Sequence, residues 1–213
     1  MEYSLSEIRR EYAQRSLSEH EVKENPVNQF KQWLDEAIKA QVPDSSAMVL
    51  STANKGNRVS SRVVLLKEIQ GEGFVFYTNY NSKKAFDLKQ NAQASILFYW
   101  PELERQVRIE GFVKVVSSSV SDKYFASRPV ESKIGAWASE QSKEIPNRQY
   151  LEKQVGKFKN EFKDREIKRP EHWGGYILKP ETIEFWQGRP NRLHDRIQFS
   201  FESNRWKVRR LAP

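Results

Sequence analysis

The sequence predicts an α+β fold in which helices pack outside an antiparallel β-barrel. Apolar residues first recur at helical spacing, and from residue 46 onward the pattern changes to short segments rich in β-branched and aromatic residues. The breaks between several of these segments are short, at residues 54–57, 70–73 and 101–102. Short breaks favour antiparallel neighbours, because parallel strands need a long crossover.

The first strong helix is expected to begin at Asn25-Pro26, where a capping residue precedes proline at the first helical position. Its buried face is predicted from apolar side chains that recur every three or four residues, namely Phe30, Trp33, Leu34, Ala37 and Ile38. Residues 1–24 are expected to form an N-terminal arm, and residues 25–213 a single domain.

The remaining elements follow from the same patterns. Strands are predicted at 47–53, 59–66, 74–78, 94–100, 106–116, 174–179, 181–187, 194–201 and 205–210. Helices are predicted at 82–90, 119–127, 131–140 and 147–164.

Composition excludes several classes of chemistry. The 213 residues include no cysteine, which rules out disulfides, thiolate nucleophiles and cysteine-based zinc sites and fits a reducing, cytoplasmic compartment. The three histidines lie far apart without metal-ligand spacing, so no metal site is expected. No apolar run is long enough for a membrane span, and the charged N-terminus lacks the apolar core of a secretory signal.

The net charge of +8 predicts a polyanionic or phosphorylated partner. The excess lies late in the chain, where residues 189–213 contain seven Lys or Arg against Asp195 and Glu202. A nucleic-acid partner therefore stays among the alternatives.

The segment 184–196 is the most informative part of the chain. Two aromatics lead into a turn, and Arg192, His194 and Arg196 follow at a spacing of two. If this run is extended, all three project from one face and repel each other unless an anion lies among them. The alternative is a solvated basic edge strand.

The segment Arg62–Lys67 is a run of four apolar residues between two cations. Such a run predicts a strand that is buried on both faces. The charges at its ends either reach solvent or meet an anion.

Two further segments have the composition of phosphate sites. Ser82 is a plausible N-cap, and Lys83 and Lys84 in the first helical turn oppose the helix dipole unless an anion binds there; the alternative is an ordinary surface helix. Tyr124 and Arg128 are four residues apart on a predicted helix and Ser132 follows, which fits either a phosphate site or a cap beside a surface pair. The chain lacks the glycine-rich phosphate loops and the nucleophile elbow.

Six ordered motifs together resemble the pyridoxine/pyridoxamine 5'-phosphate oxidase family. They are Arg62–Lys67, Phe76–Asn79, Leu103–Val107, Tyr124–Pro129, Ile134–Ser139, and Phe185–Gly188 with Arg192–Arg196. The resemblance extends over nearly the whole chain. It implies a split antiparallel β-barrel with peripheral helices and a homodimer with FMN at the subunit interface.

The resemblance also implies an activity and a set of site residues. The activity is oxidation of pyridoxamine or pyridoxine 5'-phosphate to pyridoxal 5'-phosphate, with hydride transfer to FMN and O2 as the acceptor that yields H2O2. Catalytic roles fall to Arg192 and His194. The implied FMN-binding residues are Arg62, Val63, Val64, Leu65, Leu66, Lys67, Tyr77, Thr78, Lys83, Lys84, Gln106, Gln141, Ser142, Trp186 and Arg196. The implied substrate-binding residues are Arg9, Arg10, Glu11, Tyr12, Lys67, Tyr124, Arg128, Ser132, Arg192, Leu193 and His194.

One implied position departs from the family pattern, since Lys83 stands where the family usually has arginine. A point charge replaces a two-pronged donor, so the departure concerns the affinity for FMN rather than the chemistry.

Two other functions compete with the oxidase. A basic barrel could bind single-stranded nucleic acid through 189–210, where aromatic and cationic residues alternate. A relative of the same fold could bind flavin without this oxidase activity. The presence of both Tyr124/Arg128/Ser132 and Arg192/Leu193/His194 argues against the second alternative. The resemblance leaves no role for nucleic acid, a membrane or a metal.

Overall fold

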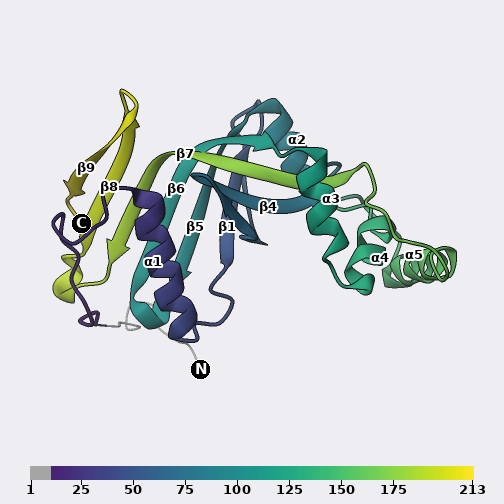
Figure 1. Ribbon diagram of the computed structural model, residues 1–213, viewed down its shortest axis with the longest axis horizontal. Helices are drawn as coiled ribbons and strands as arrows, with labels where there is room; N and C mark the ends of the chain where they lie inside the picture. Colours follow the sequence, from purple (N-terminus) through teal and green to yellow (C-terminus); the bar gives the residue numbers. More distant parts are fainter. Residues whose placement is uncertain (1–10) are drawn as a thin grey trace. The chain divides into compact units, whose positions relative to one another are not determined.

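A computed structural model describes residues 11–213 of the chain (Figure 1). These residues form two compact units. The first unit contains the chain up to Val49, Ser95–Glu110 and Pro180–Pro213, and the second contains Leu50–Ala94 and Gly111–Lys179. The predicted arm residues Arg9 and Arg10 lie outside the described residues.

The strands and helices come mostly in separate runs along the chain, as expected of an α+β protein. The helices are α1 (Pro26–Lys39), α2 (Lys83–Gln90), α3 (Ser118–Ala126), α4 (Val130–Ala138) and α5 (Arg148–Glu161), with short 3-10 turns η2 (Pro101–Leu103) and η3 (Pro190–Arg192). The strands are β1 (Ala47–Ala53), β2 (Val59–Leu65), β3 (Glu68–Gln70), β4 (Gly73–Asn79), β5 (Gln93–Trp100), β6 (Arg105–Val115), β7 (Trp173–Gln187), β8 (Asp195–Glu202) and β9 (Arg205–Leu211).

Strand pairing confirms the antiparallel prediction. The hydrogen-bonded order is β2-β1-β5-β6-β7-β4-β3, and β8 and β9 continue from β7. The β3–β4, β4–β7, β7–β8 and β8–β9 pairs are all antiparallel.

In the first unit, the predicted apolar face of α1 packs on strands β5 and β7 (Figure 1). The helix begins as expected, because Asn25 accepts hydrogen bonds from the Val27 and Asn28 amides. The ring centroids of Phe30 and Phe98 are 4.8 Å apart, and those of Trp33 and Phe185 are 5.1 Å apart. Leu34 and Ile38 were also expected on this face, but Ile38 is 58% exposed and Leu34 is only half-buried.

In the second unit, two apolar clusters hold the helices against β4 and the first half of β7. Val75, Val116 and Ile177 form one cluster, and Phe125, Ala136 and Trp173 form the other. Helix α5 packs on α4 through the contact of Phe158 with Trp137 (Figure 1). The side chain of Tyr77 contacts both clusters, which fixes the end of β4.

Strand β7 is one continuous strand, although two strands were predicted on either side of Pro180. Residues 173–178 pair with β4 and residues 182–187 pair with β8. Pro180 falls between these two ladders, so neither of them requires the amide hydrogen that proline lacks.

The prediction that the apolar run in β2 is buried on both faces is wrong. Exposure alternates along the strand, with Val63 at 67% and Leu65 at 41% exposed. The reason is that β2 ends the strand order and has one neighbour, β1, on that path. Strand β3 was not predicted. It forms because Gln70 pairs with Gly73 across a tight hairpin in which Gly71 has a positive φ.

Candidate functional site

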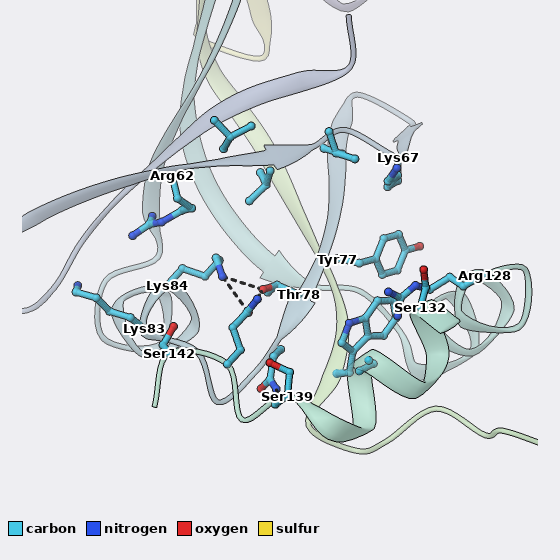
Figure 2. A pocket seen from close by; sticks show the side chains of 18 of the residues that line it. Arg62, Lys67, Tyr77, Thr78, Lys83, Lys84, Arg128, Ser132, Ser139 and Ser142 are labelled. Atoms are coloured by element: carbon cyan, nitrogen blue, oxygen red, sulfur yellow. Dashed lines mark hydrogen bonds between the residues drawn. The ribbon is translucent and has the colours of Figure 1, made fainter. Parts of the chain in front are cut away.

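A cavity of about 750 Å³ lies within the second unit (Figure 2). Its wall is built from β2, the end of β4, the start of α2, the end of α3, α4 and the loop after α4. The predicted site residues that line it are Arg62, Val63, Val64, Leu65, Lys67, Tyr77, Thr78, Lys83, Lys84, Tyr124, Arg128, Ser132, Gln141 and Ser142. Segments that are 80 residues apart in the sequence therefore meet at one site.

The charged residues that line the cavity are all positive. Five cations line it (Arg62, Lys67, Lys83, Lys84 and Arg128), and none of the described lining residues is Asp or Glu. Cations gathered around a cavity repel each other and favour an anionic ligand. The lining therefore predicts a ligand that carries negative charge.

Lys84 is the most buried of these cations, with 8% of its surface exposed. Its Nζ donates to Thr78 Oγ1 and Gln141 Oε1, both at 3.1 Å (Figure 2). It also donates to Ser82 Oγ at 3.3 Å, so all three acceptors are uncharged. Burial, together with the charge of Arg62, lowers the pKa of Lys84 from 10.5 to about 8. An anion beside this amine would restore its preference for the charged form.

Ser82 occupies the N-cap position of α2 as predicted, but its side chain caps no amide of the helix. Its hydroxyl donates instead to Asn79 O at 2.7 Å. The helix start carries Lys83 and Lys84 in its first turn, as the sequence indicated.

The other end of the cavity is aromatic. Tyr77 stacks on Tyr124 with ring centroids 3.9 Å apart and on Trp173 at 5.4 Å. The Arg128 guanidinium lies 4.6 Å from the Trp173 ring, and its buried Nη1 has no hydrogen-bond partner in the described part of the chain. A buried donor without a partner costs about 1–3 kcal/mol, so a ligand that accepts from Arg128 would remove that cost.

Arg128 reaches the cavity in a different way from the one predicted. Helix α3 ends at Ala126, so Tyr124 and Arg128 do not lie on one helical face. Arg128 follows the C-cap Ser127, where Pro129 prevents the helix from continuing. The two side chains nevertheless line the same cavity.

The labelled cations in Figure 2 fall into two groups. Arg62, Lys83 and Lys84 lie at one side of the view, and Lys67 and Arg128 lie with Tyr77 and Ser132 at the other. The cavity therefore has two cationic ends, the Arg62 end and the Arg128 end, with the strand side chains of β2 and β4 between them.

One predicted contact differs, since Leu66 is buried and does not line the cavity. The sequence reasoning also missed several lining residues: Ser60, Ser61, Asn79, Gly135, Ala136, Ser139 and Trp173. Four of them belong to the motifs Phe76–Asn79 and Ile134–Ser139, which had been recognised without being assigned to the site. The sequence did not indicate that Trp173 lines the site, because its position depends on the pairing of Asn79 with the start of β7.

The first unit holds a second group of predicted site residues. His194 lies 4.5 Å from Trp186 between ring centroids, and Tyr12 meets both rings edge-on at 5.8 Å. The Arg189 amide donates to His194 Nδ1 at 3.1 Å, which leaves Nε2 as the protonated nitrogen of the neutral ring. Burial and the charge of Arg192 lower the pKa of His194, which favours this neutral form.

The predicted row of three cations on one strand face is wrong. Arg192 lies in η3 with a positive φ of 61°, and β8 begins only at Asp195. A bound anion was expected among these cations, but the anion beside Arg196 is a carboxylate of the chain, Glu184. Glu184, which is 2% exposed, accepts two hydrogen bonds of 3.0 Å from Arg196 and one of 2.8 Å from Arg108.

The remaining predicted residues of the first unit are more exposed. Arg192 and Glu11 are exposed, Leu193 is 67% exposed, and Gln106 is half-buried on β6. Gly188 allows Tyr12 to approach closely, since a Cβ there would lie 2.8 Å from the Tyr12 ring carbon Cγ.

Residues 11–213 contain no group of three His, Cys, Asp or Glu side chains suited to hold a metal ion. No helix among these residues is both long and apolar enough to cross a membrane.

Comparison with known proteins places this chain in a class of oxidases. Residues 34–161 match the family model described as pyridoxamine 5'-phosphate oxidase, and residues 173–213 match the pyridoxine 5'-phosphate oxidase C-terminal dimerisation region. The chain belongs to the pyridoxine/pyridoxamine 5'-phosphate oxidase family.

Curated relatives agree over the full length. The chain is 50% identical over 213 residues to the pyridoxine/pyridoxamine 5'-phosphate oxidase of Cyanothece sp. (strain PCC 7425), with all of both chains covered. It is 52% identical over 210 residues to the enzyme of the same name from Polynucleobacter asymbioticus, with 99% of each chain covered.

Solved structures confirm the predicted fold class, a split antiparallel β-barrel with peripheral helices. PhzG from Burkholderia lata 383, solved with tetrahydrophenazine-1-carboxylic acid, has a TM-score of 0.87 at 32% identity and covers 91% of this chain and 95% of its own. A pyridoxamine 5'-phosphate oxidase-related, FMN binding protein from Nostoc punctiforme has a TM-score of 0.71 at 15% identity, covering 90% and 100% of the two chains.

The lowered pKa of Lys84 predicts a pH-dependent stability of the flavin-free protein. Between about pH 8 and 10.5 the unfolded chain binds more protons at this position than the folded chain, so Lys84 makes stability rise with pH. Urea unfolding at about pH 7.5 and about pH 9.5 measures this rise. The rise is expected to be larger in wild type than in Lys84→Met, with Lys153→Met, an exposed lysine of α5, as the matched control. Equal rises in wild type and Lys84→Met would contradict the assignment.

Proposed function

We propose that this protein oxidises pyridoxamine 5'-phosphate and pyridoxine 5'-phosphate to pyridoxal 5'-phosphate, with FMN as hydride acceptor and O2 as the final oxidant. The observation that supports this proposal most strongly is the cavity with a cationic group at each end and no carboxylate among its described lining residues. A reaction between a phosphorylated cofactor and a phosphorylated substrate requires two such ends.

The residues at the Arg62 end fit the phosphate of FMN. The buried Lys84 amine has only uncharged partners, and Arg62 and Lys83 line the cavity beside it. A phosphate monoester carries about −1.5 to −2 charges at pH 7 and accepts several hydrogen bonds. Tyr77, Thr78, Gln141, Ser142 and the lining residues of 62–67 would hold the rest of the cofactor. Gln106, Trp186 and Arg196 are proposed as further contacts of the cofactor.

The Arg128 end fits the phosphate of the substrate. Arg128 presents a buried donor without a partner, and Lys67, Tyr124 and Ser132 line the cavity with it. Charge-assisted hydrogen bonds from arginine to phosphate are among the strong ones in proteins. Tyr12, Arg192, Leu193 and His194 would contact the pyridine side of the substrate, with Arg9, Arg10 and Glu11 in the covering arm.

Held by residues such as Arg62, Lys83 and Lys84, FMN would supply the redox chemistry, namely acceptance of a hydride from the 4' carbon, with O2 as the final oxidant and H2O2 as the product. With pyridoxamine 5'-phosphate, water would then convert the oxidised imine to the aldehyde and release ammonia. The protein's contribution would be to hold the 4' carbon in position. Arg192 would orient the substrate ring, and the neutral His194, with its proton on Nε2, would position or protonate a group of the substrate.

We infer that the enzyme acts as a homodimer with FMN at the subunit interface. The match of residues 173–213 to a dimerisation region supports this inference. The alternation of exposed apolar residues on the edge strand β2, including Val63 beside the cavity, also fits a surface covered by a second subunit.

The nucleic-acid alternative is weaker than the sequence indicated, because several basic residues of β9 are paired within the chain. Lys207 and Arg209 bind Glu202 at 2.7 and 2.8 Å, and Arg210 binds Glu19 and Asp195, both at 2.8 Å. Cations that already have carboxylate partners release fewer counterions from a polyanion.

The absorption spectrum of the purified protein tests the function directly. We expect bound flavin whose visible bands bleach when pyridoxamine 5'-phosphate is added without oxygen and return when air is admitted. A protein that binds flavin but does not bleach with either phosphorylated vitamer would contradict the oxidase and leave a flavin-binding relative. Bleaching by tetrahydrophenazine-1-carboxylic acid, the compound in the PhzG structure, and by neither vitamer would point to a phenazine substrate instead.

Arg128→Ala tests the substrate end separately from the cofactor end. The loss of a charge-assisted phosphate contact is expected to raise KM for pyridoxamine 5'-phosphate by roughly tenfold or more, while FMN affinity changes by less than about twofold. Arg148→Ala, an exposed arginine of α5 paired with Glu152, is the matched control and should match wild type. An unchanged KM in Arg128→Ala would show that the substrate phosphate binds elsewhere.

The roles of Arg192 and His194 are tested by their alanine variants. Each is expected to lower kcat/KM for pyridoxamine 5'-phosphate by at least about tenfold, because the orientation of the reacting carbon is lost. Flavin binding to each variant serves as the folding control. If both variants stay within about threefold of wild type, the assignment is wrong.

A further inference from the structure

Thr52 on β1 lies behind the Arg62 end of the cavity and was not part of any predicted site. It is 1% exposed, and it does not line the cavity itself. Its hydroxyl accepts a hydrogen bond from Arg62 Nη1 at 2.8 Å and donates one to Asp87 Oδ2 at 2.9 Å. The direction is fixed, because a guanidinium only donates and a carboxylate only accepts.

These contacts determine how the Arg62 guanidinium is oriented. Nη1 also donates to Leu50 O at 3.1 Å, so one nitrogen makes both side-chain hydrogen bonds that Arg62 has with residues 11–213. Nε and Nη2 keep hydrogens for a ligand in the cavity that Arg62 lines. The forked geometry of arginine gives strong phosphate binding only when the fork faces the phosphate.

Asp87 is the carboxylate that accepts the hydrogen bond from Thr52. It is 4% exposed and accepts from Lys83 Nζ at 2.8 and 3.1 Å. Burial by itself raises the pKa of Asp87, but the hydrogen bonds from Lys83 and Thr52 and the nearby cations lower it overall. The carboxylate is therefore ionised and attracts every cation near it.

Arg62 Nη2 is 4.0 Å from Asp87 Oδ2, close enough for attraction but beyond a hydrogen bond. The Thr52 hydroxyl lies between the two side chains and satisfies both. Without it, the guanidinium would gain by turning toward the carboxylate and pairing with it directly, which would take donors away from the cavity.

We propose that Thr52 is a positioning residue that keeps Arg62 turned toward the flavin phosphate by bridging it to Asp87. This inference rests on the proposed function, since it assigns the phosphate of FMN to the Arg62 end. The role belongs to the Thr52 hydroxyl and not to its methyl group. Serine should therefore replace it, and valine, which has nearly the same shape, should not.

The test compares FMN with riboflavin, which has the same ring system and ribityl chain but no phosphate. Dissociation constants of both flavins are measured by fluorescence titration of the flavin-free chain. Thr52→Val is expected to weaken FMN binding by about tenfold and to change riboflavin binding by less than about twofold. Thr52→Ser should keep the wild-type preference for FMN. Thr182→Val, the same substitution at a strand residue of β7 that does not line the cavity, is the matched control and should leave both dissociation constants unchanged.

Each other outcome overturns the inference in a distinct way. Equal weakening of FMN and riboflavin in Thr52→Val would mean that Thr52 only supports the fold. FMN binding as tight as in wild type would mean that Arg62 keeps its orientation without the hydroxyl, while the proposed function would stand. A wild-type chain that binds neither flavin would refute the proposed function itself, and the inference with it.

Discussion

The excess of positive charge around one cavity is the constraint on which the rest of the site depends. Five cations line the cavity, and the described lining residues include no carboxylate. The consequences are visible in individual side chains: burial and Arg62 lower the pKa of Lys84 to about 8, and Arg128 keeps a buried donor without a partner. Asp87, behind the lining, offsets part of this charge through Lys83 and the hydroxyl of Thr52. Such an arrangement is expected to gain stability when an anionic ligand binds.

The fold of the second unit builds this cavity from a few rigid contacts. Strand β4 delivers Tyr77 and Thr78 to the wall, and its register with β7 sets Gly175 opposite Tyr77. A Cβ at Gly175 would lie 2.7 Å from the Tyr77 ring, so glycine is what allows the ring to lie against β7. The Tyr77 ring then stacks on Tyr124 and Trp173, and Trp173 in turn supports Arg128. The requirement for glycine at position 175 therefore affects, through Tyr77 and Trp173, the placement of Arg128, a residue of the proposed substrate-phosphate site.

The sequence predicted much of this, and its failures share a physical cause. The helix at Asn25-Pro26, the strand patterns and the lysines at the start of α2 depend on local periodicity and capping, which a single sequence displays. The pairing of Arg196 with Glu184 and the bridge from Arg62 through Thr52 to Asp87 depend on strand register and on segments up to 35 residues apart. Some cations pair in space with a carboxylate that is far away in the sequence, and others bind a ligand. The sequence alone does not distinguish these two kinds of cation. For this reason the sequence predicted a bound anion beside residues 192–196, whereas the anion beside Arg196 is the side chain of Glu184.

The central claim is that one cavity accepts two phosphorylated molecules at separate cationic ends. The most direct test is equilibrium binding of pyridoxal 5'-phosphate to the flavin-free and the FMN-loaded protein. FMN and pyridoxal 5'-phosphate are expected to bind together, each at its own site, and FMN is expected to change the affinity for pyridoxal 5'-phosphate by less than about tenfold, or about 1.4 kcal/mol. Stoichiometric displacement of one by the other would show a single anion site and would refute the two-site cavity.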